Sequence, residues 1–211
     1  MIVAMCVALL LNQKIKLRTF FRTLYFLPVV TSWVVVSFIF MYLFNSQAGL
    51  VNFILTDILH ITNSYHAWLS DIRTALIVII LLGIWKGIGW TMVILLAGLQ
   101  NIPENLYEVA EIDGATTFKQ FFSITLPLMR STLVYVLVML IIGSFQVFTS
   151  VYIMTGGGPM HQTEVVLSWL YTNAFNYLKL GYGSAIASLL MVFVLVISVL
   201  QIRLLSKPIE Y

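Results

Sequence analysis

The stretch from Thr74 to Leu99 reads TALIVIILLGIWKGIGWTMVILLAGL, and Lys86 is its single charged residue. A helix needs about 20 residues to cross the hydrocarbon core of a bilayer, so this stretch is long enough to span it. It lacks the apolar–polar alternation that a strand of a membrane barrel requires. The stretch therefore predicts a transmembrane helix.

Three further apolar stretches have comparable lengths, at about 24–44, 132–154 and 183–202. Of the 211 residues, 61% are hydrophobic and 9% are charged, whereas an ordinary soluble domain has roughly 25% charged residues. Every backbone polar group must be hydrogen-bonded within lipid, so all spans are expected to be α-helical. The sequence predicts an all-α, polytopic transmembrane helical bundle that forms a single domain over residues 1–211.

The N-terminal stretch 1–11 is apolar but too short to cross a bilayer. Basic residues follow it, whereas a signal peptide carries them in front. We interpret it as the last half of a spanning helix, and we expect the chain to lack an N-terminal region.

Basic residues predict the orientation, because cytoplasmic loops are enriched in Lys and Arg. If 12–23 is cytoplasmic, alternation places 45–71 and 156–182 outside, and 100–130 and 203–211 inside. The inside segments then hold Lys14, Lys16, Arg18, Arg22, Lys119, Arg130, Arg203 and Lys207, and the outside holds Arg73, just after 45–71, and Lys179. This bias explains the net charge of +3 without nucleic-acid binding.

The loop between the second and third full spans reads NIPENLYEVAEIDGA from Asn101 to Ala115 and continues TTFKQFFSITLP to Pro127. Pro103 suits the first turn of a helix, and the glutamates at 104, 108 and 111 recur along one polar face. Asp113-Gly114 can end this helix, and Thr116 or Thr117 can cap another. Such a helix could dock in a groove of a partner protein or lie on the membrane surface, although surface helices favour Lys and Arg.

The same loop carries a motif. Glu108-Val109-Ala110 is followed after three residues by Gly114, and after nine more by Ile124-Thr125-Leu126-Pro127. This resembles the EAA loop of binding-protein-dependent ABC importer permeases, with Val109 in place of the first alanine. Further similarity to the carbohydrate branch, the maltose- and glycerol-phosphate-type first permease subunit, lies in FRT at 21–23, FLP at 26–28, WKG at 85–87, AGLQ at 97–100 and MTGGGP at 154–159.

The resemblance covers essentially the whole chain, from the family's second core helix to its end. It implies the fold of a type I ABC importer permease, with a cytoplasmic coupling helix that sits in a cleft of an ATP-hydrolysing subunit. The positions that it assigns to coupling are Glu108, Ala110, Asp113, Gly114 and Glu111. The chain has no phosphate-binding Gly-x-x-x-x-Gly-Lys-Ser/Thr loop, so it is expected to be no enzyme and to bind no cofactor.

By the same resemblance, ATP and Mg²⁺ belong to partner nucleotide-binding subunits. The implied partners are a second permease subunit in a heterodimer, two ATP-binding cassette subunits and an extracytoplasmic sugar-binding protein. The implied location is the bacterial cytoplasmic (inner) membrane, and the implied function is sugar import.

The candidate solute path combines two observations. Lys86 lies near the middle of a span, where a lysine costs roughly 2.5–3.5 kcal/mol on insertion scales, so it should face a polar cavity or a partner group. Aromatic and hydrogen-bonding groups suit sugars, and the family resemblance points to Gly87, Trp90, Gly143, Ser144, Gln146 and Val147. The alternatives are that Lys86 bonds a backbone carbonyl and that the others join helices.

The resemblance also assigns Gly157, Gly158 and Pro159 to contact with the binding protein, while nearby aromatic residues could instead form an interfacial belt. A single cysteine, Cys6, and histidines without metal spacing indicate no metal site. Rival functions are a permease for another solute such as glycerol phosphate, an ion-coupled secondary transporter and a membrane enzyme. The two last are disfavoured because the spans lack carboxylates and catalytic motifs.

Overall fold

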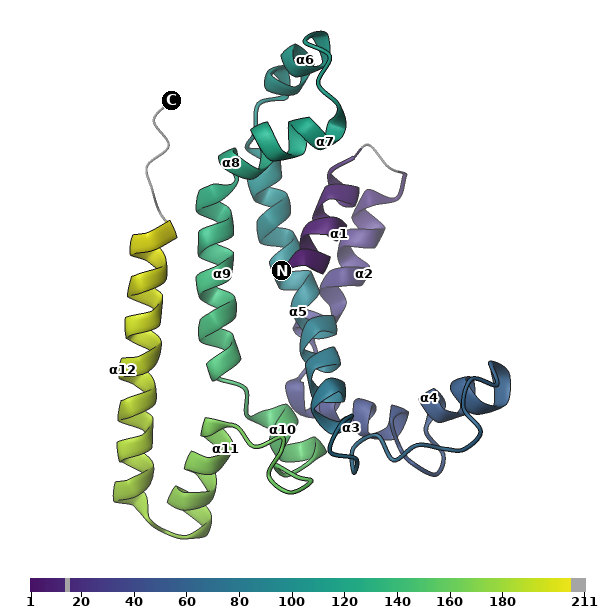
Figure 1. The fold of residues 1–211 in the computed structure, drawn as a ribbon, viewed down its shortest axis with the longest axis vertical. Helices are drawn as coiled ribbons and strands as arrows, with labels where there is room; N and C mark the ends of the chain where they lie inside the picture. Colours follow the sequence, from purple (N-terminus) through teal and green to yellow (C-terminus); the bar gives the residue numbers. More distant parts are fainter. Residues whose placement is uncertain (14–15, 206–211) are drawn as a thin grey trace. The chain divides into compact units, whose positions relative to one another are not determined.

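The computed structural model describes residues 1–13 and 16–205, so Lys14 and Lys207 of the orientation argument lie outside the described residues. Within these ranges the chain is helical and contains no strand. The elements, in order, are α1 (Ile2–Asn12), α2 (Arg18–Val30), α3 (Trp33–Leu43), α4 (Leu50–Asn52), η1 (Phe53–Ile58), α5 (Ala75–Gln100), α6 (Glu104–Ile112), α7 (Thr117–Gln120), η2 (Phe121–Thr125), α8 (Leu126–Leu128), α9 (Arg130–Phe145), α10 (Thr149–Met154), α11 (Val166–Tyr171), η3 (Thr172–Asn176) and α12 (Leu180–Leu205) (Figure 1).

Three stretches are long and apolar enough to cross a membrane: Ala75–Gln100, Arg130–Met154 and Leu180–Leu205. The 26 residues of α5 rise about 39 Å, which exceeds the roughly 30 Å of a hydrocarbon core. The second stretch consists of α9 and α10 and is interrupted at 146–148. These positions follow the predicted spans closely.

The stretch predicted as a span at 24–44 consists of two helices, α2 and α3, which count as a fourth span when taken together. Pro28 lies inside α2 and cannot donate a backbone hydrogen bond, which weakens the helix near its end. Ser32 then starts α3, because its hydroxyl accepts a hydrogen bond from the backbone N–H of Val34 at 3.3 Å. The sequence showed the proline but not the new cap.

Two compact units make up the described residues, and the boundaries between them fall within α2, α5, α9 and α12. The first unit comprises 1–13, 16–29, 87–142 and 195–205, and the second comprises 30–86 and 143–194. In the first, α1, α5 and α9 share a core that includes Ala8, Leu95 and Val136. In the second, α3, α5 and α10 share a core that includes Val36, Leu82 and Val151.

Helix α12 buries none of its most apolar window within this chain. Leu189, Met191 and Leu195 are 72, 65 and 58% exposed. A helix that is apolar all round in this way requires lipid or another helix around it.

Candidate functional site

The connection between α5 and α9 is built from α6, α7, η2 and α8 (Figure 1). Helix α6 begins immediately after Pro103, as expected, and Glu104 lies in its first turn, where a carboxylate interacts favourably with the helix dipole. It ends at the predicted glycine: Gly114 has φ +74°, its N–H donates to the carbonyl of Glu111 at 3.0 Å, and the N–H of Ala115 donates to the carbonyl of Ala110 at 2.8 Å. These two bonds form a Schellman motif, which satisfies carbonyls that the helix end would leave unpaired.

The second part of the connection is tied back to α6. Thr116 caps α7 by accepting from the backbone N–H of Lys119 at 3.4 Å, and the Gln120 amide donates to the carbonyl of Ala115 at 3.3 Å. The hydroxyls of Tyr107 and Thr125 lie 2.8 Å apart. The loop is therefore a defined helix–turn–helix structure.

The exposed surface of this loop mixes carboxylates with apolar side chains. Glu108, Glu111 and Asp113 are exposed, whereas Ala110 is half-buried. The apolar side chains of Val109, Ile112 and Phe118 are 58, 86 and 74% exposed. Exposed apolar residues of this size beside a carboxylate row favour contact with a protein groove, because such a groove can bury both kinds of group.

Lys86, on α5, is only 5% exposed. Its Nζ donates to the backbone carbonyl of Thr31 at 2.6 Å and lies 5.0 Å from the centroid of the Trp33 ring. Both contacts are at the break between α2 and α3, so this lysine interacts with the helix break. Of the two roles predicted for Lys86, the structure shows the hydrogen bond to a backbone carbonyl.

Ser144, Gln146 and Val147, which were assigned to the solute path, line a cavity of about 360 Å³ in the second unit. The other lining residues are Trp33, Leu76, Ile79, Ile80, Gly83, Phe148, Thr149, Ser150, Val151 and Val165. None of the described residues that line this cavity has a charged side chain. Trp33 was not predicted to line the solute path. The only feature of the sequence that could have indicated it is an aromatic residue directly after Ser32, where α3 begins.

Of the remaining path residues, Gly143 lies in the second unit, and Gly87 and Trp90 lie in the first. A Cβ added at Gly87 or Gly143 would meet no atom within 4 Å, so both glycines border open space. Trp90 is 47% exposed and lines a cavity of about 80 Å³ formed by α5 and α9 in the first unit. The structure thus brings Ser144, Gln146 and Val147 together but places Trp90 at another cavity.

The segment predicted to contact a binding protein is a compact turn after α10. Gly156 and Gly157 have φ +60° and +91°, and the Gly158–Pro159 peptide bond is cis. The buried hydroxyl of Thr163 donates to the carbonyl of Gly158 at 2.6 Å and lies 2.7 Å from the Thr155 hydroxyl. This places Gly157, Gly158 and Pro159 in one ordered turn.

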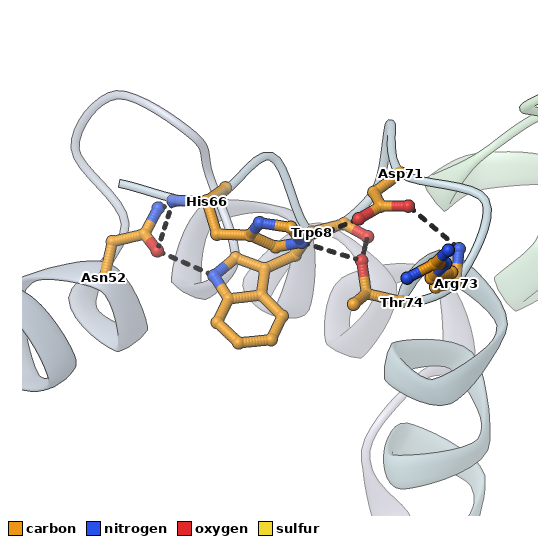
Figure 2. Close-up of polar contacts among 6 residues, drawn as sticks. All are labelled: Asn52, His66, Trp68, Asp71, Arg73 and Thr74. Carbon is orange, nitrogen blue, oxygen red and sulfur yellow. Dashed lines mark hydrogen bonds and ion pairs between the residues drawn. The ribbon is translucent and has the colours of Figure 1, made fainter. Parts of the chain in front are cut away.

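The segment between α3 and α5 is organised by Asn52, which is 2% exposed (Figure 2). Its amide nitrogen donates to the carbonyl of His66 at 2.9 Å, and its side-chain oxygen accepts from the Trp68 indole N–H at 2.7 Å. His66 Nε2 lies 3.3 Å from the Thr74 hydroxyl and 3.1 Å from an oxygen of Asp71. The sequence assigned His66 no chemistry, and these contacts give it a structural role.

Elsewhere in the same segment, the Tyr65 hydroxyl donates to Asp57 at 2.5 Å. This hydrogen bond, together with desolvation and the negative charge of Asp57, raises the pKa of Tyr65 above its ordinary value. Within the part of the chain that the structure describes, no three His, Cys, Asp or Glu side chains gather as metal ligands.

Several known proteins are similar to this chain. The permease protein AraP of the arabinooligosaccharides transport system of Bacillus subtilis (strain 168) is 36% identical over 205 residues, which cover 96% of this chain and 64% of AraP. The permease protein MalF of the trehalose/maltose transport system of Thermococcus litoralis is 36% identical over 202 residues, which cover 96% of this chain and 67% of MalF. The chain therefore spans about two thirds of the length of these relatives.

A crystal structure of a bacterial ABC transporter involved in the import of the acidic polysaccharide alginate has the same fold. It superposes with a TM-score of 0.86 at 24% sequence identity, covering 95% of this chain and 70% of that one. Residues 1–208 match a family described as binding-protein-dependent transport system inner membrane component. This match confirms the resemblance found at the EAA loop: the chain is a multi-pass membrane protein that belongs to this family of transport permeases.

Proposed function

We propose that this chain is a permease subunit of an ATP-driven sugar importer of the bacterial inner membrane. It forms half of the translocation channel beside a second permease subunit. Two ATP-binding cassette subunits bind ATP and Mg²⁺ and hydrolyse ATP, and an extracytoplasmic binding protein delivers the sugar. Support comes from the family match, from the transport systems to which AraP and MalF belong, and from the geometry of residues 100–130.

One observation supports coupling above all: α6 is an ordered helix that presents Glu108, Val109 and Ile112 to its surroundings and ends in a Schellman turn at Gly114. A rigid helix that docks in a cleft can transmit closure of that cleft to the spans that flank it, α5 and α9. We assign Glu108 and Gly114 the main coupling roles, with Ala110, Glu111 and Asp113 beside them.

A neutral sugar suits the 360 Å³ cavity better than a phosphorylated polyol. Trp33 provides an aromatic face, and Ser144, Gln146 and Thr149 provide hydrogen-bonding groups. None of the described lining residues is charged, so a phosphate in this cavity would have no counter-charge among the residues that line it. We therefore place sugar ahead of glycerol phosphate.

Ion-coupled transport has less support. Among the described residues, α5, α9 and α12 contain no Asp or Glu, which proton- or sodium-coupled carriers are expected to hold within their spans.

The proposal is tested by purifying the full-length protein with its partners in nanodiscs. Candidate binding proteins, each loaded with its sugar, are added, and ATP hydrolysis is measured. We expect one sugar-loaded binding protein to stimulate hydrolysis. Transport of the solute by the complex without any nucleotide-hydrolysing subunit would contradict the proposal.

A further inference from the structure

Two arginines of α2 converge on a neutral amide. Arg18 and Arg22 lie one turn apart, and both face the side-chain amide of Gln100 at the end of α5. With the amide oxygen turned toward these two donors, it accepts from the Nη2 atoms of Arg18 and Arg22 at 2.5 and 2.7 Å. Like charges at this spacing repel each other on a helix. The amide is uncharged, so it orients both guanidiniums without neutralising either.

Neither arginine forms an ion pair with a carboxylate of residues 1–13 or 16–205. In addition, the Nε–H of each guanidinium is buried and has no acceptor among those residues. Leaving a buried donor of a charged group without an acceptor costs about 1–3 kcal/mol or more. The pair therefore carries a positive charge that no carboxylate of the described residues offsets, and a single anion can offset it.

The surroundings indicate which kind of anion. Phe20, Phe21 and Leu24, on the same helix, are 60, 37 and 51% exposed, and Lys16 beside them is also exposed. An apolar helix surface next to basic side chains is typical of the level at which lipid headgroups meet acyl chains. A soluble partner's carboxylate would leave these apolar groups in water, whereas a lipid covers them.

We propose that Arg18, Arg22 and Gln100 form a binding site for the phosphate of an anionic phospholipid, at the predicted cytoplasmic end of α2 and α5. Phosphate oxygens accept from both guanidiniums, which match phosphate geometry through paired N–H groups. The acyl chains lie along the apolar side chains of α2. The site is independent of the solute and of the coupling role assigned above.

The test uses the full-length protein in complex with its partners, purified with phosphatidylglycerol, and native mass spectrometry to count retained lipid. Each arginine changed to glutamine is expected to weaken lipid retention about fivefold, and Arg18→Gln with Arg22→Gln together about 25-fold. Arg203→Gln, which removes the same charge from the last turn of α12, should retain lipid like the wild type.

Gln100→Glu distinguishes two roles of this cluster: binding of a phosphate, and a purely structural contact between α2 and α5. The new carboxylate would lie at hydrogen-bond distance from both guanidiniums, so it should keep α2 joined to α5 while displacing the phosphate. We expect unchanged or higher thermal stability together with loss of lipid. Equal lipid retention in Gln100→Glu, the double arginine variant and the wild type would overturn the proposal.

A second measurement distinguishes the source of phosphate. The melting temperature of the detergent-solubilised complex is followed with added phosphatidylglycerol or with inorganic phosphate at equal phosphorus concentration. Stabilisation by phosphatidylglycerol that requires the arginines is the expected result. Equal arginine-dependent stabilisation by inorganic phosphate alone would overturn the assignment to a lipid.

Discussion

Replacement of Gly114 tests whether the end of α6 couples the permease to its motor. Gly114 has φ +74°, and a Cβ added there would meet no atom within 4 Å, so a substitution is opposed by backbone conformation and not by steric contact. A left-handed conformation costs a non-glycine residue about 1–2 kcal/mol, and a β-branched residue is the least tolerant of it. Asparagine tolerates this conformation much better.

This conformational free energy destabilises α6, a helix that has little stability of its own. Helix α6 has nine residues, and isolated helices shorter than about 12–15 residues are marginal in water. A loss of about 1–2 kcal/mol lowers the population of the correctly ended helix roughly 5- to 30-fold. We expect Gly114→Val to lower binding of the ATPase subunits, and ATP hydrolysis stimulated by the binding protein, within that range.

The assay is co-purification of the full-length complex followed by ATP hydrolysis in nanodiscs. Gly114→Asn should stay within about twofold of the wild type, because its backbone cost is small. Gly156→Val is a matched control outside the loop: Gly156 has φ +60° and equally open space around its Cβ position, and this variant should bind the ATPase normally. Normal assembly of Gly114→Val, or an equal loss in Gly114→Asn, would refute the reasoning.

Three other substitutions have defined outcomes. Glu108→Lys should leave membrane insertion intact and weaken assembly with the ATPase at least tenfold, because charge reversal at a docked surface costs on the order of 2 kcal/mol or more. Assembly is measured by pull-down and transport by solute uptake. If both are unchanged, Glu108 has no coupling role. Asn52→Ala should lower the melting temperature of the complex, because it leaves half-buried partners such as the Trp68 indole N–H unpaired at about 1–3 kcal/mol each. Gly89→Ala should disturb α2–α5 packing and lower the yield of folded protein, because its Cβ would lie within van der Waals overlap of the Tyr25 carbonyl, whereas Gly87→Ala, with open space, should be neutral; equal yields in size-exclusion chromatography would contradict this contrast.

The candidate site was predictable wherever local chemistry decides the structure. The end of α6 at Gly114 follows from a glycine that can adopt positive φ, and the cap of α7 at Thr116 follows from a side chain that accepts a nearby N–H. The motif from Glu108 to Pro127 is also enough to indicate the family, because it lies in one continuous stretch of sequence.

Contacts between distant residues could not be read in this way. The sequence left open whether Lys86 faces solute or a backbone carbonyl, and folding brings it to Thr31, which is 55 positions away. In the sequence, Arg22 is only one of several basic residues of the predicted cytoplasmic loop. In the structure, Arg22 and Arg18 both contact Gln100.

An all-α membrane protein, its approximate spans and the helical loop at 100–130 followed from the amino-acid sequence, because apolar length, glycine and capping residues act within a few positions of themselves. Which polar side chains meet, which of them line the cavity with Trp33, and where the span at 24–44 breaks became clear from the packed helices alone. The physical reason is that a buried polar group takes whatever partner the packed helices bring within hydrogen-bond distance, and such partners are set by packing across the chain and not by spacing along it.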